Sequence, residues 1–340
     1  MIKFFRKIRQ QLLTQNKFSK YLLYAIGEIV LVVIGILIAL SINNWNENRK
    51  SEERMKLLLI NVQEELLLNI KSANKIIDFY REIDSLIYKV VTKTATFNNY
   101  KSNLRYSSLL GQEPKQHIID DAFKTFIASQ DKLPVKEDST VIKLKKLYGV
   151  DKPIVDEYQR ITSEFLYNFL IKLKTEKKWF SAFVYSNVNE PNDELSDYFL
   201  NDQFYLNDVI AFEIFGLQNH FPHMVYFRNR AIFNYENISE SLNLEKDSLL
   251  KKNYKDYQHY IGKYKSESLN TLEIKEYNNE LVIYQLNQDN ESIIDKSPLF
   301  PDSKKHFTYW NLFGQLTFDE SNEVTGLILS NGATRLEYVK

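Results

Sequence analysis

Residues 21–42 read YLLYAIGEIVLVVIGILIALSI, an apolar run that a single charged residue, Glu28, interrupts. As an α-helix these 22 residues are about 33 Å long, which matches the roughly 30 Å hydrocarbon core of a bilayer. The run therefore predicts a transmembrane helix at residues 21–42, and the rest of the chain is organised around it.

The charges on either side of this run predict its orientation. Residues 47–54 mix acidic and basic side chains. Residues 1–20 contain no acidic residue and six basic ones: Lys3, Arg6, Lys7, Arg9, Lys17 and Lys20. Basic residues stay on the cytoplasmic side of a span. We therefore expect a single-pass protein of the inner (plasma) membrane, with residues 1–20 as a basic cytoplasmic segment and the bulk of the chain in the periplasm.

Two alternatives concern this N-terminal region. The first alternative is a cleaved signal peptide, because Ala39-Leu40-Ser41 has small residues at the spacing of a cleavage site. However, the apolar run exceeds the usual 7–15 residues of a signal core. We therefore expect an uncleaved signal anchor. Phe4, Phe5, Ile8 and Leu12 lie at helical spacing among basic residues. They fit either a short helix on an anionic membrane surface or a simple orientation signal.

Composition excludes several kinds of site. Lys and Arg number 44, as do Asp and Glu, so the charge of this 340-residue chain favours no nucleic-acid partner. The chain has no cysteine, which removes disulfides, thiolate nucleophiles and Cys-based metal sites. We interpret its 22 Tyr and 22 Phe as core residues. We expect no cofactor and no metal.

A heptad seam follows the span. Between Gly35 and Gly111 the chain has neither glycine nor proline, so a long helix can run through. Its apolar seam has one polar member, Asn69, and consists of Leu59, Val62, Leu66, Asn69, Ala73, Ile76, Tyr80, Ile83, Ile87 and Val90. Such a seam pairs with an identical helix in a coiled coil, where Asn69 would set the register, or it packs inside a bundle. Additional apolar residues widen the stripe and favour the bundle.

The pattern then predicts a helical domain and a β-domain, an α+β fold. Residues 43–250 form the periplasmic helical domain, with further helices at 117–130, 139–147, 152–180, 194–217 and 224–250. We interpret Pro153 as a helix start and Gly149 and Gly216 as helix stops, and Pro134, Pro191 and Pro222 also lie near predicted ends. Residues 243–257 are the predicted hinge. From there, period-two alternation with short turns predicts a small antiparallel barrel or sandwich at 257–340.

Two stretches resemble known families. Residues 2–13 (IKFFRKIRQQLL), residues 16–47 (NKFSKYLLYAIGEIVLVVIGILIALSINNWNE) and the later segments LSDYFLNDQFYLNDVIAF and RNRAIFNYENISESL resemble an uncharacterised family of single-pass membrane proteins common in Bacteroidota, over about residues 1–245. The resemblance implies location and architecture, and no activity. Residues 257–340, with Tyr260-x-Gly262-x-Tyr264 and FDESNEVTGL, resemble the lipocalin-like β-domain fused to serine β-lactamase-like hydrolases. That resemblance implies an accessory role in binding or packing.

The candidate contact site in the membrane is the helix face of Gly27, Glu28, Gly35 and Ala39. A carboxyl group at this depth costs about 2–3 kcal/mol unless it is protonated, reaches the interface or finds a partner. Gly35 and Ala39 are small residues at the spacing that lets another helix approach. Three interpretations follow: a helix contact in a homo-oligomer or with a partner membrane protein, proton-coupled work, or a tolerated acid that reaches the interface.

Catalytic motifs are weak. Ser72-Ala73-Asn74-Lys75 and Tyr185-Ser186-Asn187 match fragments of serine β-lactamase motifs, but no Lys-Thr-Gly follows, so we interpret them as coincidence. His220 and His223 have no evident third ligand for a metal. We interpret His117 as part of a helix start. In the β-domain, five aromatic residues either line a pocket or fill the core: Tyr284, Phe307, Tyr309, Trp310 and Phe313.

The sequence favours a non-enzymatic envelope protein that binds a partner or supports an assembly. One alternative is a subunit of a membrane complex that uses Glu28 in proton-coupled work. Another is an enzyme of unrecognised type, which a deep polar cleft with clustered carboxylates in the helical domain would favour.

Overall fold

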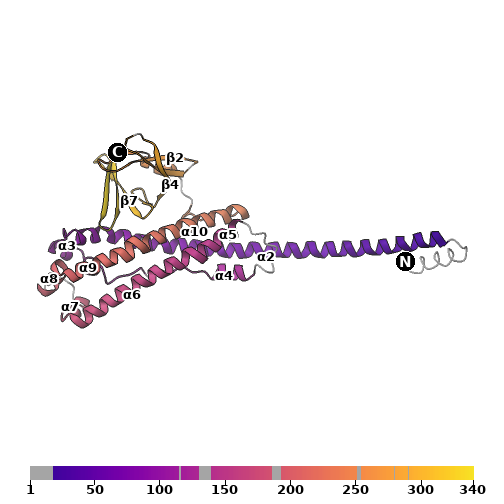
Figure 1. Cartoon of the computed structure of the whole chain (residues 1–340), viewed down its shortest axis with the longest axis horizontal. Helices are drawn as coiled ribbons and strands as arrows, with labels where there is room; N and C mark the ends of the chain where they lie inside the picture. The colour runs from indigo at the N-terminus through magenta and orange to yellow at the C-terminus, as the bar shows by residue number, and fades with distance from the viewer. Residues whose placement is uncertain are drawn as a thin grey trace. The chain divides into compact units, whose positions relative to one another are not determined.

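Helices come first and sheets last in the computed structural model of the chain (Figure 1). The structure describes residues 18–114, 116–129, 139–185, 193–250, 254–278, 280–289 and 291–340. Its contacts divide into two compact units, residues 1–59 with 125–136 and residues 60–124 with 137–340. The α+β class is confirmed. The predicted surface helix with Phe4, Phe5, Ile8 and Leu12 lies outside the described residues, as do Lys3, Arg6, Lys7, Arg9 and Lys17.

The longest helix, α2, runs from Phe18 to Val91. From Ala25 onward it includes an 18-residue window with a mean hydropathy of 2.8 in which no residue is buried. Length and composition make this part of α2 a candidate membrane span.

The heptad seam on the later part of α2 is buried in the second unit. Leu66, Asn69, Ala73, Ile76 and Tyr80 all have 0% exposure. The side-chain amide of Asn69 forms two hydrogen bonds with the backbone of Ile119. Its Nδ2 donates to the Ile119 carbonyl at 2.8 Å, and its Oδ1 accepts from the Ile119 N–H at 2.9 Å. The seam therefore packs within the chain, as the width of the apolar stripe predicts.

Eight further helices follow in the described residues. They are α3 (Phe97–Ser102), α4 (Asp121–Ala128), α5 (Ser139–Lys146), α6 (Lys152–Glu176), α7 (Phe180–Tyr185), α8 (Asp193–Asn201), α9 (Gln203–Phe212) and α10 (Phe221–Leu242). Pro153 and Pro222 lie in the first turns of α6 and α10, each of which directly follows a π-helical segment that runs into the helix. Pro134 and Pro191 lie outside the described residues.

Gly149 and Gly216 are not helix stops, so that prediction is wrong. Each lies in a π-helical segment, η2 (Leu147–Asp151) or η3 (Glu213–His220), that leads directly into the next helix. At Gly216 the reason for glycine is packing, because an added Cβ would lie 2.9 Å from Cε1 of Tyr80 on α2.

The C-terminal residues form two antiparallel sheets. The first has the order β1 (Gly262–Tyr264), β2 (Thr271–Tyr277), β3 (Glu280–Leu286), β4 (Ile293–Pro298). The second has the order β5 (Phe300–Pro301), β6 (His306–Tyr309), β7 (Leu312–Phe318), β8 (Val324–Asn331), β9 (Thr334–Val339). Among the residues that the structure describes, an isolated backbone bridge from Lys265 to Val339 connects them. The sheets share one apolar core but do not close, so the barrel alternative is wrong.

Turn residues set the hairpins of the second sheet. Gly332 has φ +57° and turns the chain between β8 and β9, as the Asn331-Gly332 pair predicts. Trp310 has φ +54° between β6 and β7, an unusual backbone conformation for a bulky residue. This places an indole ring on the surface of the turn, with 62% of the residue exposed.

Candidate functional site

The five aromatic residues predicted for a β-domain pocket lie in different surroundings. Phe307 and Tyr309 belong to the core of the sheets. Phe313 is buried and stacks on Phe221 of α10, with ring centroids 4.0 Å apart. Tyr284 is half-buried. Trp310 is exposed and lines a cavity described below.

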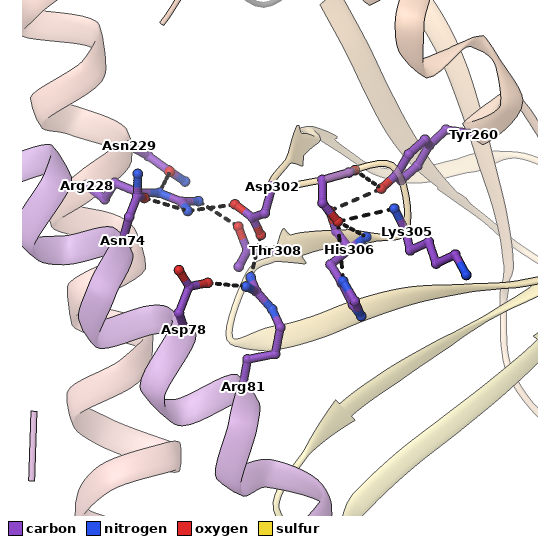
Figure 2. Close-up of polar contacts among 11 residues, drawn as sticks. Asn74, Asp78, Arg81, Arg228, Asn229, Tyr260, Asp302, Lys305, His306 and Thr308 are labelled. Carbon is purple, nitrogen blue, oxygen red and sulfur yellow. Dashed lines mark hydrogen bonds and ion pairs between the residues drawn. The ribbon is translucent and has the colours of Figure 1, made fainter. Parts of the chain in front are cut away.

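A buried arginine joins α10 to the second sheet. The Arg228 side chain is 3% exposed. Its Nη1 donates to Oδ1 of Asp302 at 2.9 Å and its Nη2 to the hydroxyl of Thr308 at 2.7 Å (Figure 2). Its Nε donates to Asn229 at 3.1 Å. The guanidinium is therefore held by partners on both the helix and the sheet.

A second arginine approaches the same carboxylate from α2. Arg81 Nη2 donates to Oδ2 of Asp302 at 2.6 Å, and Arg81 also pairs with Asp78 one turn earlier (Figure 2). Each oxygen of Asp302 thus takes one guanidinium. We call Arg81, Arg228 and Asp302 the arginine–aspartate cluster. Nearby, burial lowers the pKa of His306, and the charge of Arg81 adds to this effect.

A cavity of about 630 Å³ lies beside the arginine–aspartate cluster. Asn74, Asp78 and Asp256 also line it. Both arginines already have carboxylate partners. The lining of the cavity contains three aspartates, Asp78, Asp256 and Asp302, and only these two arginines among its described residues. The cluster therefore has no surplus positive charge for an anion, and its evident role is to hold the sheets against the helices.

A second cavity, of about 650 Å³, lies on another face of α10. We call it the aromatic groove and define it by Ile154, Tyr226, Arg230, Phe233, Phe300 and Trp310. Tyr226, Arg230 and Phe233 recur at helical spacing on α10, whereas Arg228 and Ile232 face the cavity of the cluster. Apolar side chains form most of the groove's surface, with polar groups from Asp151, Asn229 and Asn311 at its wall.

Two buried carboxylates hold the β8–β9 turn. Asp84 on α2 accepts from the Gly332 N–H at 2.6 Å and from the Ser330 hydroxyl at 2.7 Å. Glu213 in η3 accepts from the Ala333 N–H at 2.8 Å. Burial raises the pKa of Asp84, while the bonds from Ser330 and Gly332 oppose that rise. We call Asp84 and Glu213 the carboxylate clamp.

The histidines do not form a metal site in the part of the chain that the structure describes. No group of three or more metal-ligating side chains is present there. His220 Nδ1 lies 2.8 Å from the Tyr80 hydroxyl, and burial lowers the pKa of His220 to about 4. His223 instead stacks on Tyr158 and lines the aromatic groove. His220 is therefore a neutral core residue at pH 7.

The predicted contact face of the span is open in the first unit. An added Cβ at Gly27 or at Gly35 would meet no atom within 4 Å, and Ala39 is exposed. Glu28 is half-buried on the same helix. The face has room for another helix to pack.

Sequence reasoning missed the cluster and the clamp. Arg81, Arg228, Asp84 and Glu213 are charged residues within amphipathic helices, and Asp302 lies in a polar loop. A test for charges at positions that share a helical face with buried residues would have found Asp84, Glu213 and Arg228.

Comparison with known protein families finds a match to part of the chain. Residues 28–106 match the profile of a family described as "Family of unknown function (DUF6090)". No curated protein and no solved structure matches the chain. The match supports the resemblance of the candidate membrane span and the seam helix to an uncharacterised family.

Proposed function

We propose that this chain is a single-pass inner-membrane protein that acts as a non-enzymatic binding or scaffold protein in the cell envelope. The N-terminus would lie in the cytoplasm, and the helical part and the sheets in the periplasm. A partner protein or a second copy would meet the span at Gly27, Glu28, Gly35 and Ala39.

One observation supports the proposal most strongly. The apolar window of α2 is unburied, while the same helix later forms the buried seam of a folded unit. An apolar surface of this size in water favours aggregation, so it needs a bilayer or a partner. The charged side chains of the arginine–aspartate cluster and of the carboxylate clamp form hydrogen bonds and ion pairs within the protein. They therefore stabilise the fold, which favours a binding protein over an enzyme.

Partner capture tests the proposal. The full-length protein is purified from its native host in mild detergent, beside Glu28→Gln, Trp310→Ser and the control Tyr167→Ser. Tyr167 is a 64% exposed aromatic residue on α6, outside the aromatic groove.

A stoichiometric partner that Glu28→Gln loses and Tyr167→Ser retains would place the contact in the span. A partner that Trp310→Ser alone loses would place it at the groove. If no variant or wild-type sample captures a partner, and crosslinking in cells also finds none, the scaffold proposal is wrong.

A further inference from the structure

We propose that the aromatic groove binds a small amphiphilic anion, namely an aromatic or similarly flat apolar body that carries one carboxylate. This inference rests on the proposed binding function and names the class of its ligand.

The shape and lining of the groove suit a small molecule. Its volume of about 650 Å³ is within the range of small-molecule sites, roughly 300–1,000 Å³. Three aromatic residues in its wall are at least half exposed: Trp310 at 62%, Tyr226 at 51% and Phe233 at 50%. Rings gathered around one concavity offer faces and edges on which an aromatic body can pack.

The backbone holds Trp310 there at a cost. Its φ of +54° lies in the left-handed region, which a bulky residue rarely adopts because it strains the backbone. Glycine or asparagine would relieve that cost at the β6–β7 turn. The turn instead places a large ring at the mouth of the groove, where it contributes little to the core of the sheets.

The charges in the groove favour an anion. Arg230 Nη1 donates to Oδ2 of Asp151 at 2.7 Å, and the guanidinium lies 4.5 Å from the ring centroid of Tyr226. That bond uses one donor of the fork, so Nε and Nη2 can serve a carboxylate. Lys143 on α5 is not part of the lining but adds a second positive charge beside it, 4.6 Å from the ring centroid of Phe233, which belongs to the lining.

Asp151, the acidic residue in the described lining of the groove, does not cancel the attraction of Arg230 and Lys143 for an anionic ligand. Asp151 is 7% exposed and already paired with Arg230. A cationic ligand would have to compete with Arg230 for this carboxylate. An anion would meet the open side of the guanidinium and leave the pair intact.

Three naphthalene probes of different charge test the inference. The full-length protein in lipid nanodiscs is titrated calorimetrically with 2-naphthoate, 2-naphthol or 2-naphthylmethylamine, and empty nanodiscs provide the blank. We expect 2-naphthoate to bind at least about tenfold more tightly than either other probe. Trp310→Ser and Arg230→Met should each weaken naphthoate binding at least about fivefold, and Tyr167→Ser should leave it unchanged.

Each other result is decisive. Equal binding of the naphthol or the amine would overturn the anionic class and leave the binding function standing. No binding of any probe, or binding that Trp310→Ser leaves unchanged, would overturn the groove as the site, whereas partner capture tests the scaffold function separately. If Arg230→Met fails to fold, Lys143→Met tests the charge and should also weaken naphthoate binding.

Discussion

The carboxylate of Asp84 and the backbone N–H of Gly332 are joined by a hydrogen bond of 2.6 Å, which ties α2 to the turn between the last two strands. Glu213 holds the next residue of the same turn. The sheets therefore dock on the helices through a turn whose N–H groups point at two buried carboxylates. We expect the helical part from residue 60 onward and the sheets to unfold in one transition.

Removal of the Asp84 carboxylate should destabilise the fold. Asp84→Ala leaves the Gly332 N–H and the Ser330 hydroxyl without their acceptor, which costs about 1–3 kcal/mol per buried group left unpaired. Asp84→Asn keeps one acceptor oxygen and should cost less. Urea unfolding of the detergent-solubilised protein measures both, and an equal loss for the two variants would contradict the role of the oxygen.

The raised pKa of Asp84 predicts a pH dependence. Because burial raises the folded-state pKa above the unfolded value of about 3.9, the folded state binds the proton more tightly. The contribution of this group to stability is complete below the unfolded pKa and is lost as pH rises through the folded pKa. Asp84→Asn lacks this titration, so the difference between wild-type and variant unfolding free energies should change with pH in this window; a difference that does not change with pH would assign the slope to another group.

Gly332→Ala should disrupt the clamp. Gly332 has φ +57°, and an added Cβ would lie 2.3 Å from Oε1 of Glu213. We expect a loss of about 1–3 kcal/mol from strain and displacement of Glu213. Gly149→Ala is the matched control, because a Cβ there meets nothing within 4 Å, and it should not lower the melting temperature.

Arg228→Met should cost about 3 kcal/mol, because it leaves the buried Thr308 hydroxyl on β6 and one oxygen of Asp302 in the preceding loop without their donor. Asp302 keeps Arg81, which limits the loss. Arg160→Met on α6 removes an exposed arginine whose ion pairs, within the described part of the chain, are with exposed Glu157 and Glu164 on its own helix, and it should cause no measurable loss. Similar melting temperatures for the two variants would show that the cluster does not stabilise the docked sheets.

Asn69→Leu should cost about 2 kcal/mol, because it leaves the part-buried N–H and carbonyl of Ile119 without their side-chain partner. The exposed Asn61 on the same helix supplies the control, Asn61→Leu. Light scattering on both variants should show the oligomeric state of the wild type. A changed state for Asn69→Leu alone would support the coiled-coil alternative, in which Asn69 sets the register.

The periodicity of apolar residues predicted the helices and strands whose buried face follows from the local sequence pattern. The seam of α2, including its one polar member, follows from the spacing of apolar residues, and most strands follow from alternation. Gly216 was misinterpreted because its role depends on Tyr80, a residue remote in sequence that occupies the space a side chain would need.

The polar contacts between helices and sheets could not be predicted from the sequence, because their partners are also remote from one another in the chain. Asp302 lies in a polar loop that gives no local sign of its two arginine partners on α2 and α10. Trp310 was singled out as an aromatic residue, but only the positive φ of the β6–β7 turn places it at the groove and separates it from Phe307 and Tyr309 in the core.

The topology of the chain tests the central claim most directly. Because the sequence has no cysteine, single-cysteine variants Ser19→Cys and Ser268→Cys can be labelled in spheroplasts with a membrane-impermeant maleimide. The proposal predicts that the protein stays in the membrane fraction after a carbonate wash, that Ser268→Cys is labelled in intact spheroplasts, and that Ser19→Cys is labelled only after lysis. Release into the soluble fraction, or labelling of Ser268→Cys only after lysis, would contradict the proposed anchor or its orientation.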